Sequence, residues 1–314
     1  MCNMLLEEAM RTHELNDWKI DILGLLWIKI EDNHMSESYY LNKINRLNNW
    51  NYFFSDLDGT FFRWMLSKET FSLFVKFVKQ QDLLTLDSNL FKDFLDDNKY
   101  FDKLEKQAYN KSINYNDYIN AGTFLLFKYR KLIDWNDFLF YVKQHFKRRE
   151  KVNPFRFSFS KLKEVLENWD NFVFVSWAPH FALEIYLDIL RKYIEKETGI
   201  DYSNNIFWFW TYIGFDNPIC IWLFWSEYKD NFIKSIIKTG KVNKVIWWMW
   251  DTSSDYGISY NLDKKSDFFF VNPEQSVISK YNELKQDNIN YRIVFERKNL
   301  IFELSPEEVN ILDI

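Results

Sequence analysis

The chain is poor in the residues that cross-link or interrupt structure, with 2 cysteines, 5 prolines and 7 glycines among 314 residues. The cysteines, Cys2 and Cys220, are too few for a disulfide framework and fit a reducing compartment. The first residues include Glu7 and Glu8, and they lack the basic segment and apolar run of a signal peptide. A membrane-spanning helix needs about 18 consecutive apolar residues with few or no charges, and the sequence has no such stretch. We therefore expect a cytoplasmic protein without membrane contact.

An excess of positive charge is also missing. The 40 Lys and Arg residues against 45 Asp and Glu give a formal net charge of −5, which offers no electrostatic basis for binding nucleic acid. A basic segment at 143–151 is better explained as a solvated helix end than as an anion-binding patch. A hydrophobic content of 47% can supply a sizeable core for one large domain or two smaller ones.

The scarcity of glycine coincides with an abundance of tryptophan. Average usage would give roughly 22 glycines in a chain of this length, whereas the sequence has 7 glycines and 14 tryptophans. Several tryptophans follow Asn or Asp, where a turn favours glycine because it needs positive φ: Trp18, Trp50, Trp135 and Trp169. One hypothesis is that many of them are glycines in the natural protein, encoded by UGA in a host that reads UGA as Gly. The alternative is genuine tryptophan in an AT-rich genome, which the richness in Asn, Lys, Ile and Phe also indicates.

The most informative motif follows the apolar run 52–54, which predicts a buried strand. Asp56 and Asp58 come directly after it and precede the turn 59–60. Residues two apart on a strand share a face, so these carboxylates could face one small site. Paired buried carboxylates need a cation or hydrogen bonds to offset their charge. The simpler alternative is an Asp-Gly turn after an ordinary strand.

The segment 56–60, Asp-Leu-Asp-Gly-Thr, resembles the first motif of the haloacid dehalogenase-like (HAD) phosphohydrolases. The second motif of that family is an apolar strand that ends in Ser or Thr. Residues 172–176 match it and end in Ser176. The segment 176–179, Ser-Trp-Ala-Pro, resembles the form found in the phosphoserine-phosphatase-like branch.

The two remaining motifs follow in the order of the family. The third is a Lys at a helix start, matched by Lys229, with Lys234 as the alternative. The fourth is an apolar strand ending in Asp-x-x-x-Asp, matched by Asp251 and Asp255. The resemblance covers roughly residues 51–303.

The resemblance implies a two-step phosphoryl transfer. Asp56 would attack phosphorus and form an aspartyl phosphate, and Asp58 would protonate the leaving oxygen and then activate water. Ser176 and Lys229 would hold the phosphoryl oxygens. A Mg²⁺ ion would be held by Asp56, Asp58 through its backbone carbonyl, Asp251 and Asp255.

The second Asp of the motif, Asp58, favours phosphate-ester hydrolysis, since the dehalogenases of the superfamily lack it. The expected partner is a small phosphorylated metabolite, and the sequence does not choose among phosphomonoesters. Two alternatives stay open. One is a phosphotransferase or mutase on the same fold, and the other is a non-catalytic HAD-like binding protein.

The predicted fold class is α/β, a doubly wound parallel sheet (Rossmann-like HAD core) with an inserted helical cap. Residues 1–48 form an N-terminal extension. Residues 49–66 and 166–314 form the core, and residues 67–165 form the helical cap between the first and second motifs. Closure of such a cap would exclude water from the site.

The glycine hypothesis also concerns the motifs. Trp64, Trp177 and Trp250 flank them, and the resemblance places glycine at 64 and at 250. A bulky residue at 250 would crowd the metal site, which would favour the non-catalytic alternative. Codons 64, 177 and 250 of the source gene would decide between recoded glycine and genuine tryptophan.

Overall fold

The structure is a computed structural model of the full chain. It describes residues 51–62, 66–81, 88–109, 115–148, 154–213, 221–222, 244–250, 267–273, 278, 290–297 and 300–304.

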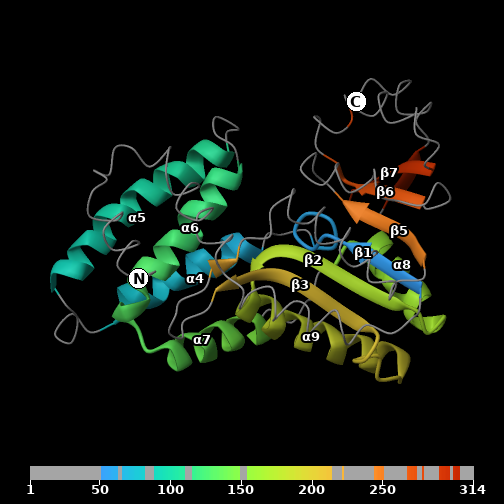
Figure 1. The fold of residues 1–314 in the computed structure, drawn as a ribbon, viewed down its shortest axis with the longest axis horizontal. Helices are drawn as coiled ribbons and strands as arrows, with labels where there is room; N and C mark the ends of the chain where they lie inside the picture. The colour runs from blue at the N-terminus through green and yellow to red at the C-terminus, as the bar shows by residue number, and fades with distance from the viewer. Residues whose placement is uncertain are drawn as a thin grey trace.

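An eight-stranded, mostly parallel sheet is the centre of the molecule (Figure 1). Its strands are β1 (Asn51–Ser55), β2 (Asn171–Pro179), β3 (Ile206–Ile213), β4 (Ile221–Trp222), β5 (Lys244–Trp250), β6 (Asp267–Val271), β7 (Asn290–Arg297) and β8 (Leu300–Leu304). They lie in the order β4-β3-β2-β1-β5-β6-β7-β8. The six strands from β3 to β7 in this order run parallel, whereas β4 and β8 pair antiparallel at the two edges. The predicted doubly wound parallel sheet is confirmed.

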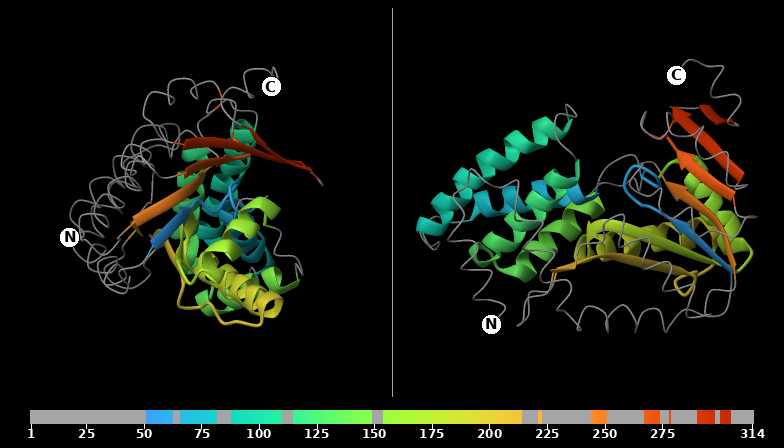
Figure 2. Two further views of the ribbon diagram at one scale, coloured as in Figure 1. Left: turned by 90° about the vertical axis from the view of Figure 1, so that its right-hand side faces the viewer. Right: turned by 45° about the horizontal axis from the view of Figure 1, so that its top comes forward.

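The strands form where the sequence has apolar runs. Every side chain of 52–55 and of 171–176 is buried, as expected for central parallel strands. The register pairs Phe53 of β1 with Phe172 of β2 and, on the other side, with Trp247 of β5. Seen end-on, the strands are rotated relative to one another along the sheet (Figure 2).

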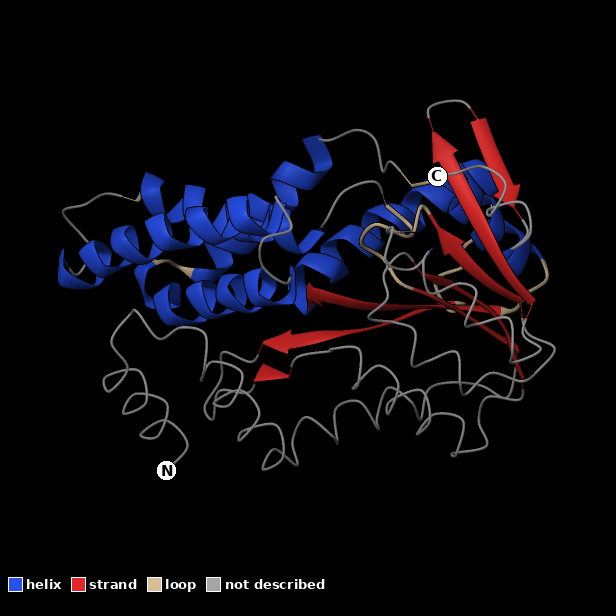
Figure 3. Cartoon of the chain, turned by 90° about the horizontal axis from the view of Figure 1, so that it is seen from above, coloured by secondary structure: helices blue, strands red, loops and turns tan. Residues whose placement is uncertain are grey.

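The helices in the described part of the chain lie along one side of the sheet in Figure 3. They are α4 (Leu66–Gln80), α5 (Ser88–Tyr109), α6 (Tyr115–Tyr129), the short 3₁₀ helix η2 (Arg130–Leu132), α7 (Trp135–Arg148), α8 (Arg156–Glu167) and α9 (His180–Thr198). Helices α8 and α9 pack directly on the strands, α8 against β2 and β7, and α9 against β2 and β3. No helix in the described part of the chain is long and apolar enough to cross a bilayer.

Helices α4 to α7 form a helical segment between β1 and β2, where the sequence predicts a cap. Within it α5 packs on α6, and α4 packs on α6 and α7 (Figure 1). Two side-chain pairs link α4 to its neighbours. Glu69 Oε1 lies 2.8 Å from Nε2 of His145 on α7, and Lys68 Nζ lies 2.8 Å from Oε1 of Glu105 on α5. Since α4 and α7 also touch α9, the helical segment is in contact with the helices of the sheet.

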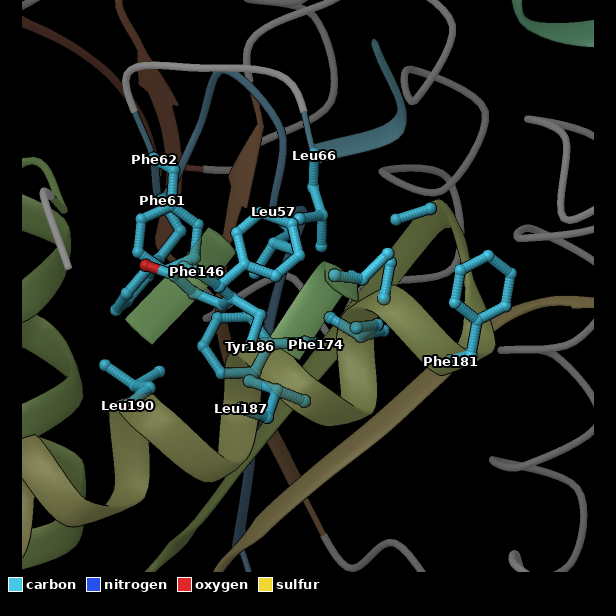
Figure 4. Close-up of a cluster of buried hydrophobic side chains, with 14 of the residues drawn as sticks. Leu57, Phe61, Phe62, Leu66, Phe146, Phe174, Phe181, Tyr186, Leu187 and Leu190 are labelled. Atoms are coloured by element: carbon cyan, nitrogen blue, oxygen red, sulfur yellow. The ribbon is translucent and has the colours of Figure 1, made fainter. Parts of the chain in front are cut away.

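An aromatic cluster holds the loop after β1 (Figure 4). The Phe61 ring packs edge-on against Phe174 of β2, with 4.9 Å between centroids. The neighbouring Phe62 ring packs against Tyr186 of α9 at 4.2 Å, and Phe146 of α7 meets the same tyrosine at 6.3 Å. Because all of these rings are buried, they fix the loop that carries the first motif.

The chain returns from the helical segment beside that same loop. The backbone N–H of Phe155 donates to Phe61 O at 2.8 Å, and Ser158 Oγ donates to Thr60 O at 2.7 Å. The buried carboxylate of Glu296 on β7 accepts from the N–H of Phe157 at 3.0 Å, in the first turn of α8. A carboxylate at a helix N-terminus satisfies N–H groups that have no partner within the helix. The motif loop, α8 and β7 are therefore tied together.

Candidate active site

The site lies where the strand order reverses. From β1 the chain proceeds through β2 to β3 in one direction, whereas β5, β6 and β7 follow in the other direction. Ligands of open α/β sheets bind at such a switch point, beyond the carboxyl ends of the strands. The strands of the first, second and fourth motifs, β1, β2 and β5, are direct neighbours there.

Asp56 is the first residue beyond β1, and it is nearly buried, with 8% of its surface exposed. Its backbone N–H donates to Met249 O of β5 at 3.0 Å, which continues the pairing of the two strands. Its Oδ1 accepts from the N–H of Leu57 at 2.8 Å, and its carbonyl accepts from Ser55 Oγ at 2.6 Å. These bonds fix both the backbone and the plane of the Asp56 carboxylate.

A single tight turn follows. The N–H groups of Phe61 and Phe62 both donate to Leu57 O at 3.0 Å, and the N–H of Gly59 donates to Phe62 O at 3.0 Å. Gly59 has φ +78°, in the left-handed region that costs glycine little. The turn closes directly after Asp58, so Asp56 and Asp58 both lie within three residues of the end of β1.

Asp58 is also 8% exposed, and its carboxylate lies at the beginning of α4. Its Oδ1 accepts from the N–H of Leu66 at 2.8 Å. Its Oδ2 accepts from Ser67 Oγ at 2.9 Å and from the N–H of Ser67 at 3.3 Å. The acidic side chain thus caps the first helix of the helical segment, where the helix dipole favours negative charge.

Ser176 of β2 is fully buried, and the register places it at the same sheet edge. Ser55 of β1 pairs with Phe174, so Ser176 lies two residues further toward the carboxyl end of β2. Its Oγ accepts from the N–H of Ala178 at 3.0 Å, and a hydroxyl that accepts can still donate its own proton. The pairing of β2 with β3 shifts register between Ser176 and Pro179, an irregularity of the kind that re-aims side chains beside functional sites.

Two residues near Asp58 were not predicted from the sequence. Ser67 is one, although a Ser at the start of a helical run was a signal for capping. Tyr186 is the other: burial, and second the charge of Asp58, raise the pKa of its phenol well above the ordinary value. The phenol is therefore neutral at physiological pH. The Tyr186 ring is part of the aromatic cluster beside the motif loop (Figure 4). His180 is the first residue of α9, a common place for a His without a chemical role, and none is assigned to it.

The remaining predicted site residues lie outside the described residues: Lys229 with its alternative Lys234, Asp251 and Asp255. Among the residues that are described, no group of three or more His, Cys, Asp or Glu is placed to hold a metal ion. The carboxylate and carbonyl oxygens of Asp56 and Asp58 are donors of the type that Mg²⁺ prefers. The structure thus brings Asp56, Asp58 and Ser176 to one sheet edge, and the donor chemistry there fits the ion.

No family model and no curated protein matches the chain. Among solved structures, a protein of unknown function from Bordetella pertussis Tohama I is similar, with a TM-score of 0.52 at 10% identity, over 77% of this chain and 97% of that one. A HAD-family hydrolase from Salmonella enterica serovar Typhi gives a TM-score of 0.40 at 10% identity, over 74% of this chain and 66% of the other. A probable phosphoserine phosphatase from Vibrio cholerae gives 0.41 at 7% identity, over 76% and 61%. The first likeness supports the fold, and the other two are too distant to add to it.

The chain thus combines a HAD-like first motif with the doubly wound fold predicted for it. The carboxylates of that motif lie at the switch point of the sheet.

Proposed function

We propose that this chain is a HAD-like, Mg²⁺-dependent phosphatase that hydrolyses a small phosphomonoester through an aspartyl phosphate on Asp56. One observation carries the proposal. Asp56 and Asp58 are both nearly buried at the carboxyl end of the central strand, yet they have different hydrogen-bond partners. Two carboxylates in different environments suit two different roles.

In the first step an Oδ atom of Asp56 attacks phosphorus, and the bond from phosphorus to the leaving oxygen breaks. Asp58 gives its proton to that oxygen, so an alcohol leaves and an aspartyl phosphate remains. The bonds that Asp56 makes with Leu57 N–H and Met249 O hold the nucleophile in place before substrate arrives. Such preorganisation lowers the entropic part of the barrier.

In the second step Asp58 accepts a proton from water, whose oxygen attacks phosphorus. The bond between phosphorus and the Asp56 oxygen breaks, and inorganic phosphate leaves. Ser176 is suited to donate a hydrogen bond to a phosphoryl oxygen, because its hydroxyl is buried at the same edge. Lys229 is proposed to neutralise charge on the phosphoryl group.

The proposed ligands of Mg²⁺ are Asp56, the carbonyl of Asp58, Asp251 and Asp255. The ion, when bound, supplies positive charge that offsets the charge of phosphate and carboxylates. These assignments rest on the motifs and on the oxygen donors of Asp56 and Asp58.

Removal of the metal should abolish the activity. We expect 4-nitrophenyl phosphate hydrolysis, followed by nitrophenolate absorbance, to fall on the order of 100-fold or more in EDTA, since Lewis-acid stabilisation is worth several kcal/mol. Excess Mg²⁺ should restore the rate, which separates metal loss from unfolding. An unchanged rate in EDTA would contradict the metal assignment.

A further inference from the structure

The carboxylate of Asp58, which follows the central strand of the sheet, accepts hydrogen bonds from the helical segment. Asp58 follows β1, and three donors in the first turn of α4 bond to its carboxylate: the N–H of Leu66, the N–H of Ser67 and the hydroxyl of Ser67. Ser67 is 1% exposed, so water does not compete for these bonds. Both Oδ atoms accept, which fixes the rotation of the carboxylate as well as its position.

The position of this first turn depends on the rest of the helical segment. The residue after Ser67, Lys68, pairs with Glu105 of α5, and Glu69 pairs with His145 of α7. Thr70 Oγ1 donates to Leu66 O at 2.8 Å inside the turn. These contacts position the first turn of α4 relative to α5 and α7. Because the turn bonds to Asp58, they also determine where its carboxylate lies.

We propose that Ser67 is a positioning residue: it orients the carboxylate of Asp58 for proton transfer to the leaving group. The rate of this proton transfer then depends on the position of α4. The inference rests on the proposed function. A displacement of about 1 Å at a reacting group can cost on the order of 100-fold in rate, so the loss of one of three bonds has a measurable effect.

The test compares two esters that differ in how much they need a proton. Phenyl phosphate has a poor leaving group, whereas 4-nitrophenyl phosphate releases a stable anion that needs little protonation. The kcat/KM value covers substrate binding and the first phosphoryl transfer, and it does not include hydrolysis of the aspartyl phosphate. We expect Ser67→Ala to lower kcat/KM for phenyl phosphate about 10-fold or more and for 4-nitrophenyl phosphate less than about 3-fold. Ser67→Thr, which keeps the hydroxyl, should restore most of the difference.

A matched control is Thr123→Ala, which removes a buried hydroxyl that donates to Ile119 O within α6. Any change that it causes in kcat/KM should be equal for the two esters. Equal losses for both esters in Ser67→Ala would overturn the positioning role. If neither ester is hydrolysed by the chain as printed or by a variant with Trp64→Gly, Trp177→Gly and Trp250→Gly, the proposed function itself is refuted, so the two failures are distinguishable.

A second inference comes from the end of α8. The N–H of Trp169 donates to Leu166 O at 2.9 Å, and the N–H of Asp170 donates to Val165 O at 3.1 Å. This pair of bonds is a Schellman motif, in which the residue after the helix cap adopts the left-handed conformation and is usually glycine. Trp169 occupies that place with φ +59°. At the end of the neighbouring α9 the left-handed residue is Gly199, with φ +72°.

The side chain of Trp169 is only partly packed. It is 52% exposed, and its ring meets the Tyr202 ring at 5.5 Å. Trp135 differs, although it too follows a turn-forming residue, Asp134. It begins α7, its ring lies 5.0 Å from that of Phe181, and Asp134 Oδ1 accepts from the N–H of Asp137 as a helix N-cap. The glycine turn expected at Trp135 is therefore wrong, since the position is the start of a helix.

We infer that position 169 is glycine in the natural protein and that its codon is UGA. The natural protein, purified from its source and digested, should give a peptide spanning 168–170 whose mass corresponds to Asn-Gly-Asp. A peptide with tryptophan, or a UGG codon, would overturn the inference.

A stability comparison tests the same position in the recombinant chain. Trp169→Gly should raise the urea midpoint, because it relieves the left-handed backbone. Trp169→Asn, which tolerates this conformation, should raise it less. Trp135→Gly is the control and should lower the midpoint, since it removes a packed ring from a helix start. A lower midpoint for Trp169→Gly would contradict the backbone argument.

Discussion

Asp56→Asn should reduce the hydrolysis of 4-nitrophenyl phosphate by a factor on the order of 1,000 or more. The amide has the shape of the carboxylate, and its oxygen can still accept the bond from Leu57 N–H. It lacks the negative charge and the nucleophilicity that phosphoryl transfer to Asp56 requires. A factor of 1,000 corresponds to about 4 kcal/mol of transition-state stabilisation.

The matched measurement is the free energy of unfolding of the same variant. Because the neutral amide keeps the acceptor, we expect stability to change by less than about 1 kcal/mol. The variant is then a folded protein with a specific chemical defect. Full activity in Asp56→Asn would refute the nucleophile assignment.

Substitutions at Asp58 should have two separable effects, because this carboxylate is both the proposed acid/base and the cap of α4. Asp58→Asn keeps an acceptor oxygen for the first turn of α4 but cannot transfer a proton. We expect its activity to fall on the order of 100- to 10,000-fold, the usual contribution of general acid–base catalysis. Asp58→Ala removes the acceptor too and should cost about 1–2 kcal/mol of stability in addition, as for other lost helix caps.

Urea unfolding measures the stability of both variants, and hydrolysis of 4-nitrophenyl phosphate measures their activity. Equal stability of the Asn and Ala variants would show that the bonds to Leu66 and Ser67 do not stabilise α4. Wild-type activity in Asp58→Asn would show that another group handles the proton.

The fold class could be predicted from the sequence because its signals are local. Apolar runs such as 52–54 and 172–176 predicted central strands, and the order of strands and helices predicted a parallel, doubly wound sheet. The carboxyl ends of adjacent parallel strands meet at one edge, so the proximity of Asp56 and Ser176 follows from the same reasoning.

The partners of Asp58 could not be predicted in the same way. Leu66 and Ser67 reach its carboxylate only because the turn at Gly59 folds the chain back. That closure depends on the packing of Phe61 and Phe62 on β2 and α9, which is a tertiary property. Tyr186 lies far away in the sequence and carries no motif.

The tryptophans illustrate the same limit. Trp135 and Trp169 both follow a turn-forming residue, so the sequence treats them alike. Backbone geometry separates them, because one begins α7 and the other has the left-handed conformation after α8. A dipeptide pattern does not contain the hydrogen bonds that close a Schellman motif.

Trapping of the aspartyl phosphate tests the proposed function most directly. Asp58→Asn should still accept a phosphoryl group from 4-nitrophenyl phosphate, whose leaving group needs little protonation, but it should hydrolyse the intermediate slowly. After mixing with this ester and Mg²⁺ and quenching in acid, mass spectrometry should find one phosphoryl group on the peptide that contains Asp56. The experiment is run with the chain as printed and with a variant that also carries Trp64→Gly, Trp177→Gly and Trp250→Gly. We expect the adduct in at least one of the two and none when Asp56→Asn is added; its absence from both, or a phosphoryl group on another residue, would contradict nucleophilic catalysis by Asp56.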